Sequence, residues 1–203
     1  MKNIDKENLL FSPRYLASLI IPLTIETLLN VTIGMADTMM VSQAGEAAVS
    51  GVSVVDSIQS LMVFLLSAFA TGGAVVASQY LGRGEEQKAS YSAKQLMYLT
   101  LAFSLLISVI FLIFRDGTIR VIYGSLEESV FSSATAYFTP ILISLPFFAV
   151  QSSANTLCRS MGKSNITMWV SILVNMINII GNAIFLFAFN MGASGVGISS
   201  AIS

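Results

Sequence analysis

The chain alternates between long apolar runs and short polar segments. Four runs contain no Asp, Glu, Lys or Arg: residues 57–81, 96–114, 129–158 and 164–203. A helix needs about 20 apolar residues to cross a bilayer, and each run reaches or approaches that length. An unpaired backbone N–H or C=O costs several kcal/mol in hydrocarbon, so segments this long should be helices; barrel strands need only about 9–11 alternating residues.

We therefore predict an all-α integral membrane protein, a polytopic bundle of five full transmembrane helices and the start of a sixth. The predicted spans are residues 15–41, 49–81, 96–114, 131–158 and 165–189, and the sixth begins near residue 192. The turns after the first and fifth spans are short and rich in small residues, which favours antiparallel neighbours in one bundle. The first span exceeds the apolar core of a signal peptide, so we expect it to be retained.

The composition excludes several other classes of protein. The chain is 55% hydrophobic and 10% charged, with a mean hydropathy of +0.79, whereas soluble domains contain about 25% charged residues. The net charge is −1 and the basic residues are scattered, which argues against nucleic-acid binding. With one cysteine, Cys158, and no histidine, there is no disulfide framework or Cys/His zinc site. No nucleophile–base pair or metal cluster indicates an enzyme.

The basic residues predict the orientation in the membrane. Eight precede the first span or follow the second and fourth, and two follow the third. The eight are Lys2, Lys6, Arg14, Arg83, Lys88, Lys94, Arg159 and Lys163; the two are Arg115 and Arg120. Because cytoplasmic loops carry the excess of Lys and Arg, we predict a multi-pass protein of the cytoplasmic membrane with its N-terminus in the cytoplasm.

The first span carries two acidic residues, which are functional candidates because ionisable groups are costly in lipid. Glu26 and Asp37 are eleven residues apart, about three helical turns, so they project from one face. Asn30 and Gly34 share that face. An alternative for Glu26 is an interfacial carboxylate that reaches the headgroups or pairs locally. Pro22, one turn earlier, removes a backbone donor and predicts a bend in this helix.

Other spans also carry polar faces. In the fifth span four polar residues at offsets of four, three and four form one stripe: Ser171, Asn175, Asn178 and Asn182. The alternative explanation for the stripe is hydrogen bonding between helices. The fourth span adds Gln151 and Asn155 on one face, and we interpret these two, with Asn30 and Asn175, as candidates for the wall of a substrate cavity. Asp56 lies in the first turns of the second span, where a helix dipole favours a carboxylate, and a structural role is favoured there.

Several segments of the chain resemble those of a known family. The segment IPLTIETLLNVTIGMADTMMVSQAG, with a proline, an acidic residue and an aspartate–threonine pair before a short glycine loop, resembles the first helix of the MATE (multidrug and toxic compound extrusion) transporters. Three later segments agree in order: GGAVVASQYLGRGEEQKA, CRSMGKSNITM and NIIGNAIFLFAFNMGASGVGISSAIS. The resemblance covers nearly the whole chain.

The resemblance implies a transporter of twelve helices in two lobes, which exports drugs and organic cations in exchange for protons or sodium ions. Residues 1–203 would be its N-terminal lobe, up to the middle of helix six, and the partner would be a missing C-terminal lobe. No cofactor is implied beyond the coupling ion. The main alternative is a lipid-linked oligosaccharide flippase of the same superfamily, although such proteins line their cavity with basic residues; a non-transporting membrane scaffold is another.

The resemblance also implies a cation-coupling site. Carried over by position, it consists of Asp37, Asn178, Asn182 and Ser200, and Pro22 matches the proline at which the first helix bends. Several proton-coupled members have a second aspartate at the position of Asn182. This difference favours either a sodium ion held by oxygens of Asp37, Asn178 and Asn182, or one exchanged proton, because hard cations prefer oxygen ligands. Glu26 is the reserve candidate for coupling.

Two basic residues near the fourth span are expected to be structural. We predict that Arg159 and Lys163 lie in a cytoplasmic turn and set topology, because a fixed positive charge repels cationic cargo.

Overall fold

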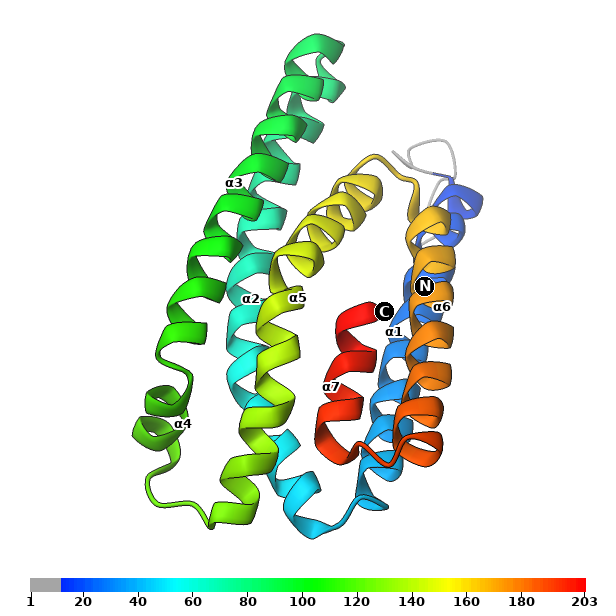
Figure 1. Cartoon of the computed structure of the whole chain (residues 1–203). Helices are drawn as coiled ribbons and strands as arrows, with labels where there is room; N and C mark the ends of the chain where they lie inside the picture. The colour runs from blue at the N-terminus through cyan, green and yellow to red at the C-terminus, as the bar shows by residue number, and fades with distance from the viewer. Residues whose placement is uncertain (1–11) are drawn as a thin grey trace, which may run out of the picture.

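The computed structural model describes residues 12–203, and all the secondary-structure elements of these residues are helices (Figure 1). In chain order these are α1 (Pro13–Ser42), α2 (Glu46–Gly82), α3 (Glu86–Ile113), α4 (Arg115–Tyr123), α5 (Glu128–Ser160), α6 (Ser164–Ala183), the π-helical segment η2 (Ile184–Ala188) and α7 (Gly192–Ile202). Five helices are long and apolar enough to cross a membrane, with α6 and η2 forming the fifth, and α7 is a shorter apolar helix. The predicted five spans and the start of a sixth are confirmed.

The third span begins earlier than predicted. We expected residues 96–114, but α3 starts at Glu86, ten residues before residue 96. The chain turns at Gly84, whose φ of +75° suits a residue without a side chain, and the helix forms directly after it. Lys88 and Lys94 therefore lie on the polar first turns of a helix and not in a loop.

A short helix between the third and fourth spans was not predicted. This helix, α4, presents Ile119 to the core, where it is fully buried, while Arg115 donates a hydrogen bond from Nη1 to Thr139 Oγ1 of α5 at 2.7 Å. With nine residues, it is too short for hydrophobic periodicity to reveal it in the sequence.

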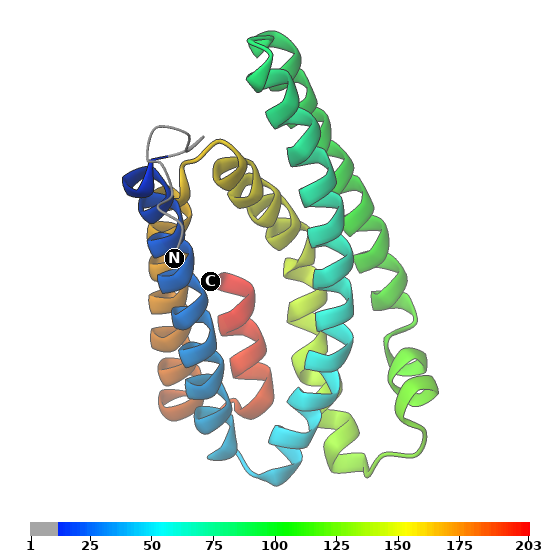
Figure 2. The same cartoon turned by 180° about the vertical axis from the view of Figure 1, so that it is seen from behind.

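The helices form two groups (Figures 1 and 2). The helices α2, α3 and α5 pack together on one side, and α1 lies along α6 on the other. Between these groups lies α7, which contacts both α5 and α6. The two groups meet around α7, at the loop that joins α1 to α2, and where α5 approaches α6.

Two glycines explain the close approach of α5 to its neighbours. A Cβ atom on Gly51 of α2 would lie 2.7 Å from the backbone N of Ala134, and one on Gly197 of α7 would lie 2.8 Å from the carbonyl O of Tyr137. Small residues at such crossings let helix backbones approach closely, which drives packing in membranes. The core beside these crossings contains Val55, Leu66, Phe138 and Leu142.

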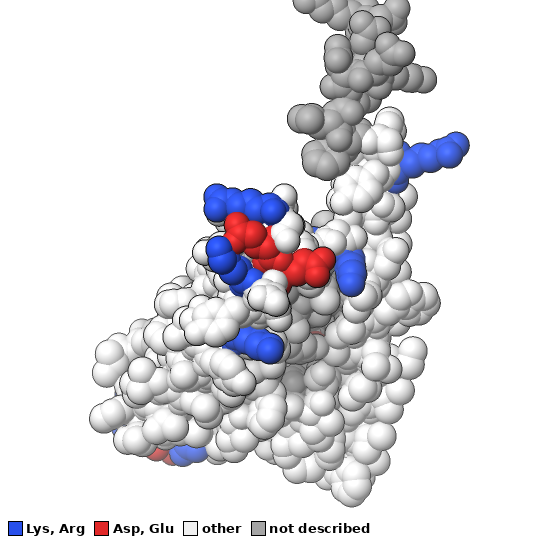
Figure 3. Space-filling model, turned by 90° about the horizontal axis from the view of Figure 1, so that it is seen from above, with Lys and Arg blue, Asp and Glu red and all other residues white. Residues whose placement is uncertain are grey.

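The surface fits a multi-pass membrane protein. Seen from above, a cluster of charged side chains lies on the end that faces the viewer, a few more lie at the edges of the view, and most of the remaining visible surface is uncharged (Figure 3). Large apolar side chains are exposed along the helices, including Phe64 (72%), Phe147 (76%) and Trp169 (65%). Soluble proteins rarely expose so much contiguous apolar surface. The orientation of this bundle in the membrane stays a prediction.

Pro22 lies inside α1 and is buried. The helix is continuous through it, so the proline does not end the span, and the bend expected there stays a prediction.

Candidate functional site

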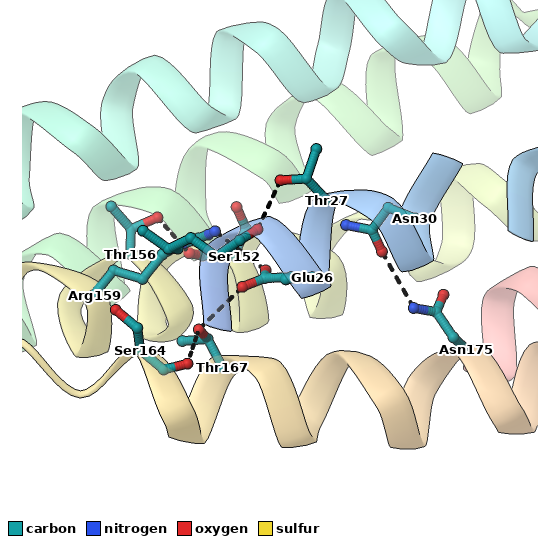
Figure 4. Close-up of polar contacts among 10 residues, drawn as sticks. Glu26, Thr27, Asn30, Ser152, Thr156, Arg159, Ser164, Thr167 and Asn175 are labelled. Carbon is teal, nitrogen blue, oxygen red and sulfur yellow. Dashed lines mark hydrogen bonds and ion pairs between the residues drawn. The ribbon is translucent and has the colours of Figure 1, made fainter. Parts of the chain in front are cut away.

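The polar face of α1 lies against the polar face of α6. Glu26 accepts a hydrogen bond from Thr167 Oγ1 at 3.1 Å, and Asn175 Nδ2 donates to Asn30 Oδ1 at 3.2 Å (Figure 4). Further along the same pair of helices, Asn182 Nδ2 donates to Asp37 Oδ1 at 2.7 Å. The prediction that Glu26, Asn30 and Asp37 lie on one face of this helix is confirmed, because each of them contacts α6.

The four residues of the expected coupling site meet where α1, α6 and α7 come together. Besides its bond to Asp37, Asn182 Nδ2 donates to Asn178 Oδ1 at 3.0 Å. Asn178 Nδ2 lies 3.4 Å from Ser200 Oγ of α7. Asn182 is fully buried and Asn178 nearly so. Within residues 12–203, no Lys or Arg forms an ion pair with Asp37, and its hydrogen-bond partner Asn182 is neutral.

Asp37 and the two amides form a tight triangle in which the Asn178 amide has two possible orientations. With the Asn178 oxygen facing inward, it lies 2.9 Å from Asp37 Oδ1, so two acceptors meet. With the amide turned over, its nitrogen donates to Asp37 Oδ1 at 2.9 Å, so both amides donate to the carboxylate. The first orientation fits a protonated Asp37 or a cation between the oxygens, and the second fits the ionised carboxylate. In addition, the buried Oδ1 of Asn182 has no partner among the described residues.

A second carboxylate lies near this cluster. Tyr137 of α5 donates a hydrogen bond from its hydroxyl to Asp56 Oδ1 of α2 at 3.0 Å. Asp37, Asp56 and Tyr137 all line one small cavity of about 120 Å³ between α1, α2, α5 and α7. The two bonded residues are 81 positions apart in the chain, and no local pattern in the sequence indicates their pairing.

Glu26 has a very different environment. Its side chain is only 8% exposed, and Arg159 Nη1 lies 3.2 Å from Glu26 Oε1 (Figure 4). Arg159 belongs to the last turn of α5 and not to the turn that follows, where we had expected it. Lys163 does lie in that turn. Glu26 therefore pairs with a charge from another helix, which is the pairing that the alternative interpretation included; its position relative to the membrane interface stays a prediction.

The cavity candidates line a separate groove between α1, α5 and α6. Its volume is about 380 Å³. Its polar wall contains Glu26, Asn30, Gln151, Asn155, Arg159, Ser171 and Asn175, and Phe148 and Val174 supply apolar wall. Asn178 and Asn182 do not reach it. The stripe of α6 is thus divided between two sites, one in this groove and one around Asp37.

The chain is similar to known transporters. A protein-family model described as MatE matches residues 22–184. The uncharacterized transporter YisQ of Bacillus subtilis is 30% identical over 193 residues, which cover 93% of this chain and 42% of that protein. The multidrug export protein MepA of Staphylococcus saprophyticus is 24% identical over 184 residues, covering 90% and 40%.

Solved structures share the fold. An outward-facing multidrug resistance MATE family transporter matches with a TM-score of 0.86 at 19% identity, over 93% of this chain and 41% of that one. A MOP superfamily transporter from Pyrococcus furiosus, described as having a binding pocket of reverse polarity, matches with a TM-score of 0.87, also at 19% identity and with the same coverage. The chain thus spans about two fifths of the length of the proteins it matches. It belongs to the MatE family and corresponds to the N-terminal half of such a protein.

Proposed function

We propose that residues 1–203 form one lobe of a secondary antiporter that exports drugs and organic cations across the cytoplasmic membrane in exchange for sodium ions or protons. Asp37 is the principal coupling group. The observation that carries the proposal is the set of partners around Asp37: two buried amides and no basic side chain among the described residues. Support also comes from relatives such as MepA, which is named a multidrug export protein.

The contrast with Glu26 supports Asp37 as the coupling group. A coupling group must change its net charge when it takes up a cation. Glu26 already has the charge of Arg159 at 3.2 Å, so an added cation would meet a neutralised site. Asp37 keeps an uncompensated charge when ionised, and a proton or sodium ion neutralises it.

The triangle of Asp37, Asn178 and Asn182 supplies a two-state element. An ionised Asp37 accepts hydrogen bonds from both amides when Asn178 is turned over, whereas a bound proton or cation lets the Asn178 oxygen face Asp37. The hydrogen-bond pattern of this buried network thus differs between the two charge states. Ion uptake therefore changes the free energy of the contact between α1 and α6, which is what coupling to a conformational change requires.

The residues present fit a sodium ion as well as a proton. Asp37 offers a carboxylate, Asn178 and Asn182 offer amide oxygens, and Ser200 offers a hydroxyl, all hard oxygen ligands of the kind that alkali and alkaline-earth cations prefer. The Oδ1 atom of Asn182 is buried and has no hydrogen-bond partner among the described residues, and with this amide turned over the oxygen would face Asp37 and could bind the ion. Sodium bound there would supply a positive charge in place of a proton.

The groove is the proposed contact surface for cargo within this lobe. Asn30, Gln151, Asn155 and Asn175 supply neutral hydrogen-bonding groups, beside apolar wall from Phe148. Among residues 12–203, Arg159 is the one basic residue that lines it, and it is paired with Glu26. This arrangement favours organic cations over the pyrophosphate headgroup that a flippase holds. The second lobe, which would complete the cavity, is the proposed partner.

The test is transport by the intact protein with Asp37→Asn. Efflux of ethidium from proteoliposomes is followed under an imposed sodium gradient and, separately, an imposed proton gradient. We expect efflux driven by the coupling ion to fall to the level of protein-free vesicles. Asp116→Asn, in the exposed part of α4, is the matched control and should transport normally. Unchanged efflux of Asp37→Asn in both gradients refutes the assignment, and loss in Glu26→Gln alone moves the role to Glu26.

A further inference from the structure

The carboxylate of Asp56 has no role in the function proposed above. It lies on α2 with its side chain exposed on one side, while its Oδ1 is fixed by the hydroxyl of Tyr137, which is only 6% exposed. A buried phenol that donates to a carboxylate holds that carboxylate in one position. Asp56 is thus both oriented and open to a small cation or proton.

Asp56 shares its cavity with Asp37. The walls are otherwise mainly apolar, with Val41, Val49 and Val196 among them, and no Lys or Arg of residues 12–203 lines the cavity. In such surroundings two negative charges repel each other more strongly than in water, so the first proton or cation to bind is held more tightly than the second. Uptake of a proton or cation at one carboxylate then changes the affinity of the other.

The two carboxylates lie on opposite sides of a structural boundary. Asp37 is bonded to α6 through Asn182, and Asp56 is bonded to α5 through Tyr137. These are the two helix groups of the bundle, α1 with α6 and α2 with α5 (Figure 2). Repulsion between the carboxylates pushes the groups apart at this point, and neutralisation of either carboxylate removes it. The charge state of the pair is therefore linked to the spacing of the two groups.

We propose that Asp56 is a second ion-coupling carboxylate, which takes up a proton or a monovalent inorganic cation jointly with Asp37 across this cavity. The inference rests on the proposed function, because it adds a partner to the coupling role of Asp37. Each carboxylate takes up one proton or one monovalent cation. In one transport cycle the pair therefore takes up one more coupling ion than Asp37 alone. Tyr137 is the positioning residue, since it acts through Asp56.

The test counts coupling ions in the intact transporter. The reversal potential for ethidium export from proteoliposomes, measured against imposed sodium or proton gradients, gives the number of ions exchanged per cargo. We expect Asp56→Asn to lower this number by one while transport continues, and Asp56→Glu to restore it. Tyr137→Phe keeps both carboxylates and should keep the number. Because the lost hydrogen bond favoured the ionised form of Asp56, the apparent affinity for a coupling proton should rise by about tenfold, whereas a coupling sodium ion, which needs the ionised carboxylate, should bind less tightly.

The outcomes separate the two proposals. A wild-type ion number in a correctly inserted Asp56→Asn protein, together with lost coupling in Asp37→Asn, overturns the role of Asp56 and leaves Asp37 as the single coupling group. A wild-type ion number in Asp37→Asn refutes the proposed function itself. If Asp56→Asn does not insert, Tyr137→Phe decides, and an unchanged ion affinity in that variant overturns the inference.

Discussion

The two ends of the contact between α1 and α6 bury a carboxylate in opposite ways. At one end Glu26 has a guanidinium and a hydroxyl as partners, Arg159 and Thr167. At the other end Asp37 has only amides. A carboxylate with a fixed countercharge keeps its ionised state and ties helices together, whereas a carboxylate among neutral groups can exchange its charge with a bound ion. Two carboxylates eleven positions apart thus suit different roles. We call Glu26, which ties helices together, the anchor, and Asp37, which can bind and release an ion, the switch.

The largest effect on stability is expected from Arg159→Gln. This change leaves the Glu26 carboxylate, 8% exposed, without a countercharge, and breaking a buried ion pair costs about 3–5 kcal/mol. Because Arg159 is partly exposed, we expect the lower limit, about 3 kcal/mol. The free energy of unfolding in detergent measures it, with Lys163→Gln, in the exposed turn, as the control.

A double variant tests whether the cost comes from the pair. Glu26→Gln combined with Arg159→Gln removes both charges and should recover more than half of the loss, as a double-mutant cycle would show. If the loss of unfolding free energy in the double variant equals the sum of the losses in the two single variants, the two charges do not stabilise each other. Glu26 would then not hold α1 to α5 through Arg159.

A smaller effect on stability is expected from Asp37→Asn. Asparagine has nearly the same shape and keeps an oxygen for Asn182, and no countercharge is left behind. We expect the unfolding free energy to change by less than about 1 kcal/mol, in either direction. The unfolding measurement used for Arg159→Gln decides this point. A loss similar to that of Arg159→Gln would mean that Asp37 is an anchor like Glu26, and the distinction between the two ends would be wrong.

Much of this arrangement was predictable from spacing within one helix. The helix period put Glu26, Asn30 and Asp37 on one face of α1, and long uncharged runs located five spans, because both signals are local. The family resemblance grouped Asp37 with Asn178, Asn182 and Ser200, and the structure places them together.

Contacts between helices were not predictable in the same way. Arg159 lies 133 positions after Glu26, and Tyr137 lies 81 after Asp56. Such pairs depend on how the helices cross, and one sequence contains no periodic signal for a crossing. The division of the α6 stripe between the groove and the Asp37 cluster has the same origin, since it follows from where α5 and α7 approach α6.

The smallest stability effect is expected midway between the two ends, at Asn175. Its amide donates to Asn30 at 3.2 Å beside the groove, and hydrogen bonds between helices in membranes contribute about 0.6 kcal/mol on average. Asn175→Ala should therefore change the unfolding free energy by about that amount or less. If the groove contacts cargo, the same variant should nevertheless weaken ethidium binding severalfold, because a polar group facing the ligand is lost while the anchor and the switch remain.

Asn165→Ala provides the matched control, since Asn165 is an exposed amide on the first turn of α6 and does not line the groove. Fluorescence titration of the intact transporter with ethidium compares the two variants. Weaker binding in Asn175→Ala alone would place cargo between the two carboxylates, within reach of a conformational change at either end. Equal binding in both variants would mean that the contact between Asn30 and Asn175 is only a hydrogen bond between helices, which is the alternative explanation given above for the polar stripe of α6. The cargo site would then lie outside this groove.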